Sequence, residues 1–144
     1  PRLLDMGAPA FLLASTVNLV VAQRLVRRIC ASCVSSYPMP NALKALTRQV
    51  ASAAGMHGKD IPATLYKGKG CKVCGHSGFA GQVGIFELLR VSDSIRSLLL
   101  KLTPVMEIRK QAIKEGMRTI FEDGLEKVEK GVTTIEEILR VVRE

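Results

Sequence analysis

Apolar residues recur at the three-to-four-residue spacing of a helix throughout the last third of the chain. The pattern predicts four short amphipathic helices, which begin near residues 92, 104, 119 and 134. Ser92 is expected to cap the first, and Thr133 or Thr134, with Glu136 or Glu137 three residues later, predicts a capping box for the fourth. Helices of this length are not stable alone, so we expect them to pack together as a compact bundle.

The first ninety residues mix helical and extended patterns. Pro9 suits the first turn of a short helix, and Asn41 is expected to cap a longer one that ends before a glycine. Leu19–Ile29 is rich in β-branched residues and partly alternating, so either a strand or a continued helix fits it. Six glycines between residues 68 and 84 predict a region made largely of turns. A mostly buried strand is expected over Val83–Val91.

Positive charge is concentrated in the front of the chain, whose 144 residues carry a net charge of +8. Residues 1–60 hold seven basic against two acidic side chains, residues 61–90 four against one, and residues 91–144 ten against ten. This predicts a basic front part, residues 1–91, with a cysteine-bearing subdomain at about 30–75, and a neutral helical subdomain, residues 92–144. The most apolar stretch, residues 8–22, is shorter than the roughly 20 residues of a membrane span, so we interpret it as core.

Four cysteines form two CxxC pairs, Cys30 with Cys33 and Cys71 with Cys74, and 37 residues separate the pairs. The two-residue spacer lets both sulfurs of a tight turn reach the same ion, and two such turns supply the four thiolates of a tetrahedral Zn²⁺ site. Because all four ligands would come from the protein, no position stays open for water, and the predicted zinc is structural. Buried or disulfide-linked cysteine pairs and a dithiol redox centre are the alternatives.

Recognisable catalytic motifs are missing from the sequence. It contains no G-x-x-x-x-G-K-[ST] phosphate loop, no HExxH, and no Ser, His and Asp set in a known motif. His57 and His76 are interpreted as loop and turn residues. The basic front also fits a zinc-ribbon module that binds nucleic acid, although six aromatic residues and no Trp leave little surface for stacking on bases. We therefore expect no catalysis by this chain alone and keep the nucleic-acid module as the alternative function.

Several stretches resemble, in order, the C-terminal part of the type II secretion and type IV pilus assembly ATPases. The paired cysteines make the resemblance specific to the secretion and pilus-extension branch. Ser77, Phe79 and Gln82 depart from the residues usual in the family, and the inserted segment Val34–Lys69 shows no clear match. The matching stretches are RLLDMG (2–7), FLLAS (11–15), AQRLVRRIC (22–30), GCKVC (70–74), GFAG (78–81), GIFEL (84–88), GMRT (116–119), DG (123–124) and GVTTIEEILRV (131–141).

The resemblance implies a cytoplasmic, hexameric RecA-type motor that hydrolyses ATP and lies peripheral to the inner membrane. Its partners would be the inner-membrane platform protein and neighbouring motor subunits, and nucleic acid would not be among them. The family's phosphate loop, acidic boxes and His box would lie upstream, so ATP and magnesium would be bound by the parent protein and not by this fragment. Cys30, Cys33, Cys71 and Cys74 fall on the family's tetracysteine metal motif.

The resemblance also implies that Val20–Ile29 and Val83–Leu89 are paired strands. With them, the expected fold is α+β and mainly α: helices with a short antiparallel strand pair, a tetracysteine zinc-binding insertion and a C-terminal helical bundle. Zinc would then pin the strand end, the inserted helix and the glycine-rich turn into one unit. Such a domain would act through structure and protein contacts.

Overall fold

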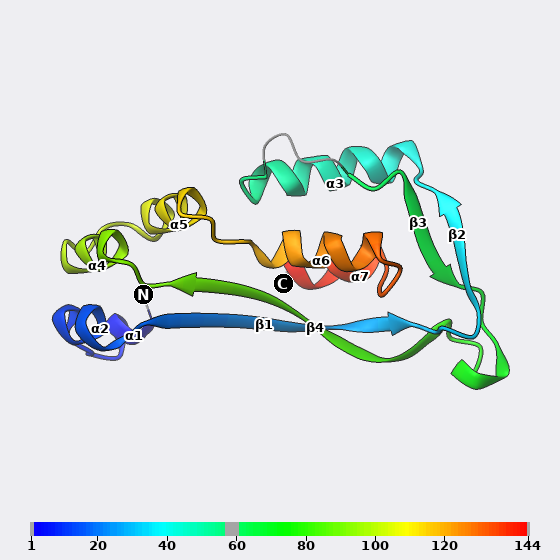
Figure 1. Cartoon of the computed structure of the whole chain (residues 1–144), viewed down its shortest axis with the longest axis horizontal. Coiled ribbons are helices and arrows are strands. Elements are labelled where there is room, and N and C mark those ends of the chain that lie inside the picture. Colours follow the sequence, from blue (N-terminus) through cyan, green and yellow to red (C-terminus); the bar gives the residue numbers. More distant parts are fainter. Residues whose placement is uncertain (1, 57–60, 144) are drawn as a thin grey trace. The chain divides into compact units, whose positions relative to one another are not determined.

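The computed structural model describes residues 2–56 and 61–143, and the predicted loop residue His57 lies outside this part of the chain. The fold is mixed α and β, as expected. Along the chain, helices precede the first strand and follow the last, and one longer helix lies between two of the strands (Figure 1). The elements are α1 (Arg2–Asp5), α2 (Ala10–Thr16), β1 (Leu19–Ile29), β2 (Val34–Pro38), α3 (Asn41–Ala53), β3 (Thr64–Gly68), the 3₁₀ turn η1 (Lys72–Cys74), β4 (Phe79–Arg90), α4 (Asp93–Leu100), α5 (Val105–Lys114), α6 (Ile120–Glu129) and α7 (Ile135–Arg143).

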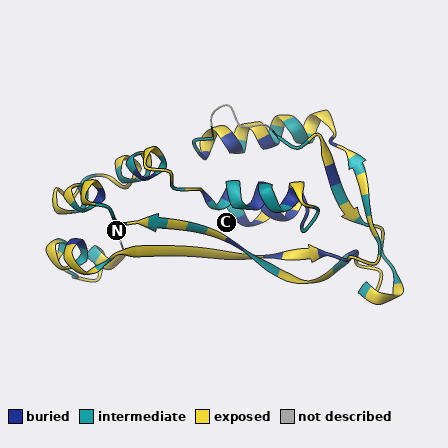
Figure 2. Cartoon of the chain, in the orientation of Figure 1, coloured by how far each residue is buried: buried dark blue, intermediate teal, exposed yellow. Residues whose placement is uncertain are grey.

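Strands β1 and β4 form one two-stranded sheet. The carbonyl before β1, on Asn18, accepts from the N–H of Val91 at 2.9 Å, and the N–H of Cys30 donates to Gly78 at 3.0 Å. The start of each strand therefore meets the end of the other, and the pair is antiparallel. A strand rather than a helix over Leu19–Ile29 is confirmed, as is the pairing that the family resemblance implied. Figure 2 shows that β1 is exposed along most of its length.

Strands β2 and β3 form a second antiparallel pair, in register from Val34 opposite Gly68 to Pro38 opposite Thr64. This pair was not predicted, and its first strand, β2, ends with Tyr37 and Pro38. The sequence VSSYP lacks the clear apolar alternation of a strand. Pro38 is tolerated because it ends the strand, where a missing N–H is least costly.

The chain divides into two compact units, each assembled from two separate segments. Unit 1 comprises the described residues of 1–22 and 87–118, and unit 2 those of 23–86 and 119–144. The expected division into residues 1–91 and 92–144 follows charge along the sequence and stays a prediction. The four C-terminal helices form as predicted, with α4 and α5 in unit 1 and α6 and α7 in unit 2.

Unit 1 is built on a small apolar core. Val91, Ile95 and Ala112 are buried there, and residues of α4, α5 and the end of β4 pack around them. Ser92 caps α4 as predicted, since its hydroxyl accepts from the N–H of Ile95 at 3.3 Å. Arg96 fixes the adjacent segment by donating to the carbonyl of Ala14 and to the side chain of Asn18.

Unit 2 has the larger core, which joins the insertion to the last two helices. Thr119 and Glu122 form a capping box at the start of α6, with bonds of 3.3 and 2.7 Å. The prediction that Asn41 caps α3 is wrong: Pro40 occupies the cap position and no side chain caps this end. No helix in the described ranges is long and apolar enough to cross a bilayer. The buried core residues are Val26, Met39, Ala51, Ala54, Leu65, Ile85, Phe121, Leu125, Val128, Ile135, Ile138, Leu139 and Val141.

Candidate metal centre

Two tight turns in unit 2 carry the four cysteines. The first follows β1, where the N–H of Cys33 bonds back to the carbonyl of Cys30 at 3.2 Å. The second lies in η1, where the N–H of His76 bonds to the carbonyl of Cys71 at 2.9 Å. Gly75 ends this turn at φ +55°, a left-handed conformation that glycine adopts without steric cost. Each CxxC pair therefore occupies the kind of turn that its spacing predicted.

Backbone contacts bring the two turns together. The N–H of Cys30 donates to Gly78 at 3.0 Å, and the N–H of Lys69 donates to Cys33 at 2.9 Å. The two backbone segments lie very close together at Gly68, where a Cβ atom would lie 2.1 Å from the carbonyl oxygen of Gly78. Since any side chain at Gly68 would collide with backbone, the glycines of this region position the cysteines as well as making turns.

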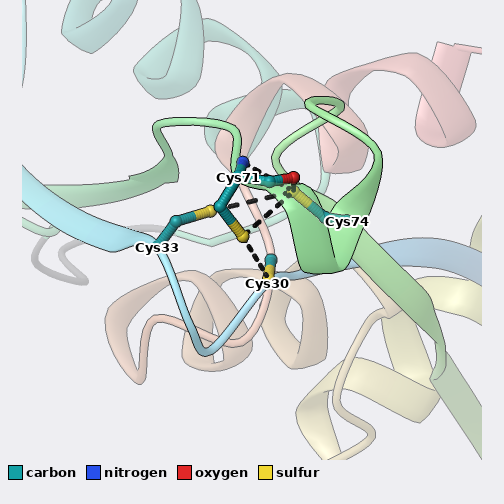
Figure 3. Close-up of side chains that lie close together, drawn as sticks. All are labelled: Cys30, Cys33, Cys71 and Cys74. Carbon is teal, nitrogen blue, oxygen red and sulfur yellow. Dashed lines mark hydrogen bonds between the residues drawn. The ribbon is translucent and has the colours of Figure 1, made fainter.

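All four sulfurs meet in one cluster, with their Sγ atoms within 4.8 Å of one another (Figure 3). Cys30 and Cys71 lie 3.9 Å apart between Sγ atoms, as do Cys33 and Cys74, and Cys71 and Cys74 lie 3.7 Å apart. Corresponding cysteines of the two pairs are 41 positions apart in the sequence, and together the pairs form a single site. Among residues 2–56 and 61–143, this is the one group of three or more Cys, His, Asp or Glu side chains that could hold a metal.

The sulfur spacing fits a tetrahedral metal. With metal–sulfur bonds of about 2.3 Å, the edges of a Zn(Cys)₄ tetrahedron are about 3.8 Å long. Three of the six sulfur pairs already stand at 3.7 to 3.9 Å. Four thiolates are also the donor set that structural zinc prefers. The residues therefore fit a zinc ion, which would be held by Cys30, Cys33, Cys71 and Cys74 and would supply cross-linking rather than chemistry.

Backbone amides favour a thiolate at one corner of the cluster. The N–H groups of Cys71 and Gly78 donate to the sulfur of Cys74 at 3.2 and 3.3 Å, and these bonds lower the pKa of Cys74 to about 6. Burial acts in the opposite direction at Cys33 and raises the pKa of that thiol to about 11. Cys74 is therefore the thiol that ionises more readily than Cys33. A cysteine must lose its proton to bind a metal.

The four cysteines differ in how far they are exposed to solvent. Cys30 is buried, at 1% exposed, whereas the other three thiols are partly open. His76 lies in an exposed turn at φ +63° and is not part of the sulfur cluster, which confirms its interpretation as a turn residue. Val73, between the second pair of cysteines, is 74% exposed, so the tip of this turn faces solvent.

An ion pair that sequence reasoning missed joins α7 to Arg27, three residues before Cys30. The carboxylate of Glu137 accepts from the backbone N–H of Arg27 at 2.9 Å and from its Nη2 at 2.7 Å, and Arg140 bonds to the same carboxylate. Burial raises the pKa of Glu137, but the bonds from Arg27 and Arg140 outweigh it and lower the pKa to about 2. The sequence offered Glu137 only as a helix-capping residue. Its backbone N–H does bond to Thr134, at 3.4 Å, but its side chain turns to β1.

The chain is similar to known proteins along nearly its whole length. A family model described as "Type II/IV secretion system protein" matches residues 1–140. The chain is 41% identical over 139 residues to the type IV pilus assembly ATPase PilB of Thermus thermophilus. This match covers 96% of the chain and 15% of that relative. It is 41% identical over 143 residues to the type II secretion system protein E of Pseudomonas aeruginosa, covering 99% of the chain and 27% of that relative. The chain therefore spans about a quarter, or less, of the length of these relatives.

Proposed function

The chain belongs to the type II/IV secretion system protein family, and from this membership we propose that it is the C-terminal, zinc-binding domain of a hexameric secretion or pilus-assembly motor. The family resemblance carried by the cysteine pairs and their flanking motifs is confirmed. In the proposal, ATP and magnesium bind upstream in the longer polypeptide. This domain contributes structure and contacts to neighbouring subunits and to a platform protein at the cytoplasmic face of the inner membrane.

The convergence of the four cysteines is the observation that carries the metal part of the proposal. Cys30, Cys33, Cys71 and Cys74 come from two turns that are distant in sequence, and their sulfurs stand near the spacing of a zinc tetrahedron. Four protein ligands leave no open position on the metal, which favours a structural role over a catalytic one.

Zinc content tests the metal role directly. The purified chain is expected to contain one zinc per molecule by elemental mass spectrometry, and Cys71→Ser is expected to contain none. His76→Asn is the matched control, because His76 lies beside the second turn outside the cluster and Asn tolerates its left-handed backbone. A wild-type chain purified without zinc, and unable to take it up, would contradict this role.

Nucleotide turnover tests the division of labour. The longer polypeptide is expected to assemble as a hexamer and hydrolyse ATP, whereas the 144-residue chain, which lacks a phosphate loop, is expected to hydrolyse none. ATP hydrolysis by the chain alone, after removal of contaminating ATPases, would overturn the assignment of a structural role.

The alternative, a zinc-ribbon module that binds nucleic acid, is supported by the net charge of +8. Three of the few aromatic rings are already covered by cations of the chain itself: Phe79 by Arg27, Tyr37 by Lys67 and Phe86 by Lys127. Each of these rings has one face occupied by a cation, and this face is less available for stacking on bases. Titration with a nonspecific DNA duplex at low salt distinguishes the two functions, since the alternative requires tight binding that weakens steeply as salt rises.

A further inference from the structure

The end of β1 forms backbone hydrogen bonds in two directions. The N–H of Cys30 donates to Gly78, in the second cysteine turn, at 3.0 Å. The N–H of the preceding residue, Ile29, donates to Val132, in the corner between α6 and α7, at 2.9 Å. The last residue of β1 therefore contacts the corner that leads into α7, and the next residue, Cys30, contacts the second cysteine turn.

The side chain of Arg27 makes the same connection through polar and aromatic contacts. Its guanidinium bonds to Glu137 on α7 at 2.7 Å and lies 4.2 Å from the ring centroid of Phe79, which directly follows Gly78. The carbonyl of Arg27 accepts from the hydroxyl of Thr133, just before α7, at 2.8 Å. Arg27 thus contacts the first residue of β4, which follows the cysteine turn, and also contacts α7.

Burial makes the contact to α7 costly to lose. The side chain of Glu137 is 3% exposed, and it remains ionised because Arg27 and Arg140 both bond to it. A buried carboxylate that loses one partner keeps its desolvation cost without its compensation. The position of α7 therefore depends on the position of Arg27, and Arg27 depends in turn on the strand end that leads into Cys30.

On the basis of the proposed zinc site, we propose that metal binding at the four cysteines and docking of α7 are thermodynamically coupled through Arg27. A metal that fixes Cys30 and the turn at Gly78 holds the end of β1 where Arg27 can meet Glu137. Because coupling between two sites is reciprocal, metal binding favours docking of α7 by the same factor by which docking favours metal binding. A variant that undocks α7 therefore loses up to that factor in metal affinity. Metal binding then stabilises the docked position of α7, although α7 supplies none of the metal ligands.

Hydrogen exchange on the 144-residue chain, with zinc bound and after removal by a chelator, measures one direction of the coupling. The amides of α7 are expected to lose protection when zinc is removed, whereas those of α4 and α5 in unit 1 keep theirs. Unchanged α7 protection in a chain that binds zinc stoichiometrically would overturn the coupling and leave the zinc site intact. A chain that takes up no zinc would overturn both the metal role and this inference.

Zinc affinity, measured by competition with a chelator, gives the other direction. Glu137→Gln is expected to weaken zinc binding about tenfold, within the usual range for coupled sites. If that variant does not fold, Arg27→Lys replaces it, because it keeps the positive charge but loses the fork that binds the carboxylate. Wild-type zinc affinity in the folded variant would overturn the inference.

Two control variants separate this route from general loss of stability. Glu107→Gln makes the same chemical change in the exposed pair with Lys110 in unit 1, and it is expected to leave zinc affinity unchanged. Val128→Ala trims the buried core of α6 without removing a polar contact. An equal loss of zinc affinity in Val128→Ala and Glu137→Gln would show that Arg27 is not the connection.

Discussion

The backbone and the side chain of Arg27 both bond to the carboxylate of Glu137, a residue 110 positions later in the chain. The bonds measure 2.9 and 2.7 Å, and they join the end of β1 to the first turn of α7. No buried side-chain nitrogen or oxygen in the described ranges lacks a hydrogen-bond partner, so this charged contact is fully compensated where it stands.

Truncation of this carboxylate is expected to be costly. Glu137→Ala should lower the free energy of unfolding by about 2 kcal/mol, because it leaves a part-buried backbone N–H without its acceptor and two half-exposed arginines without their shared partner. Urea denaturation measures the change. Glu107→Gln, in an exposed pair, is expected to change it by less than about 0.5 kcal/mol. A loss as small as that in Glu137→Ala would contradict the interpretation.

Acid should remove the same contribution. The pKa of Glu137 in the folded chain is about 2, below its ordinary 4.5, so the folded state favours the ionised form. The stabilisation is therefore complete above about pH 5 and is lost as the pH falls toward 2. Denaturation of wild type and Glu137→Gln at matched pH, both in chelator, should show a stability difference that shrinks between pH 6 and 3. A difference that stays constant would contradict the low pKa.

Metal removal should destabilise the chain only where the cysteine site is intact. Chelation is expected to lower the melting temperature of the wild type by roughly 10 °C or more, since the binding energy of a structural zinc is folding energy. Cys71→Ser should start from the lower temperature and show no response to chelator. His76→Asn should respond as the wild type does. Scanning calorimetry with and without chelator checks all three proteins.

Two glycines near the cysteines should differ in what they tolerate. Gly68→Ala is expected to cost more than about 2 kcal/mol and to impair zinc binding, because its Cβ would stand 2.1 Å from the backbone oxygen of Gly78. Gly75→Asn should be nearly neutral, since the space around that position is open and Asn accepts its left-handed φ of +55°. Unfolding free energies and zinc content of the two variants test the contrast, and equal effects would refute it.

Local signals predicted the helices and the cysteine turns, while contacts between distant segments escaped them. Ser92 marked a helix start correctly, because capping depends on a few neighbouring residues. The convergence of two CxxC pairs followed from ligand chemistry. The β2–β3 pair did not, because its short polar strands gain their stability from each other and from the core beneath Leu65. The ion pair of Glu137 with Arg27 could not be predicted either, since the sequence around a helical glutamate does not indicate which distant arginine, here 110 positions away, it will contact.

The two-segment construction of unit 2 has a consequence for its synthesis on the ribosome. Within unit 2, residues 23–86 are made first, then the second segment of unit 1, residues 87–118, and only afterwards α6 and α7. All four thiols can therefore come together and bind a metal before α6 and α7 have added their buried residues to the core of unit 2. Glu137 is made 110 residues after Arg27, so the ion pair and the core contacts of α6 and α7 can form only after the cysteine site.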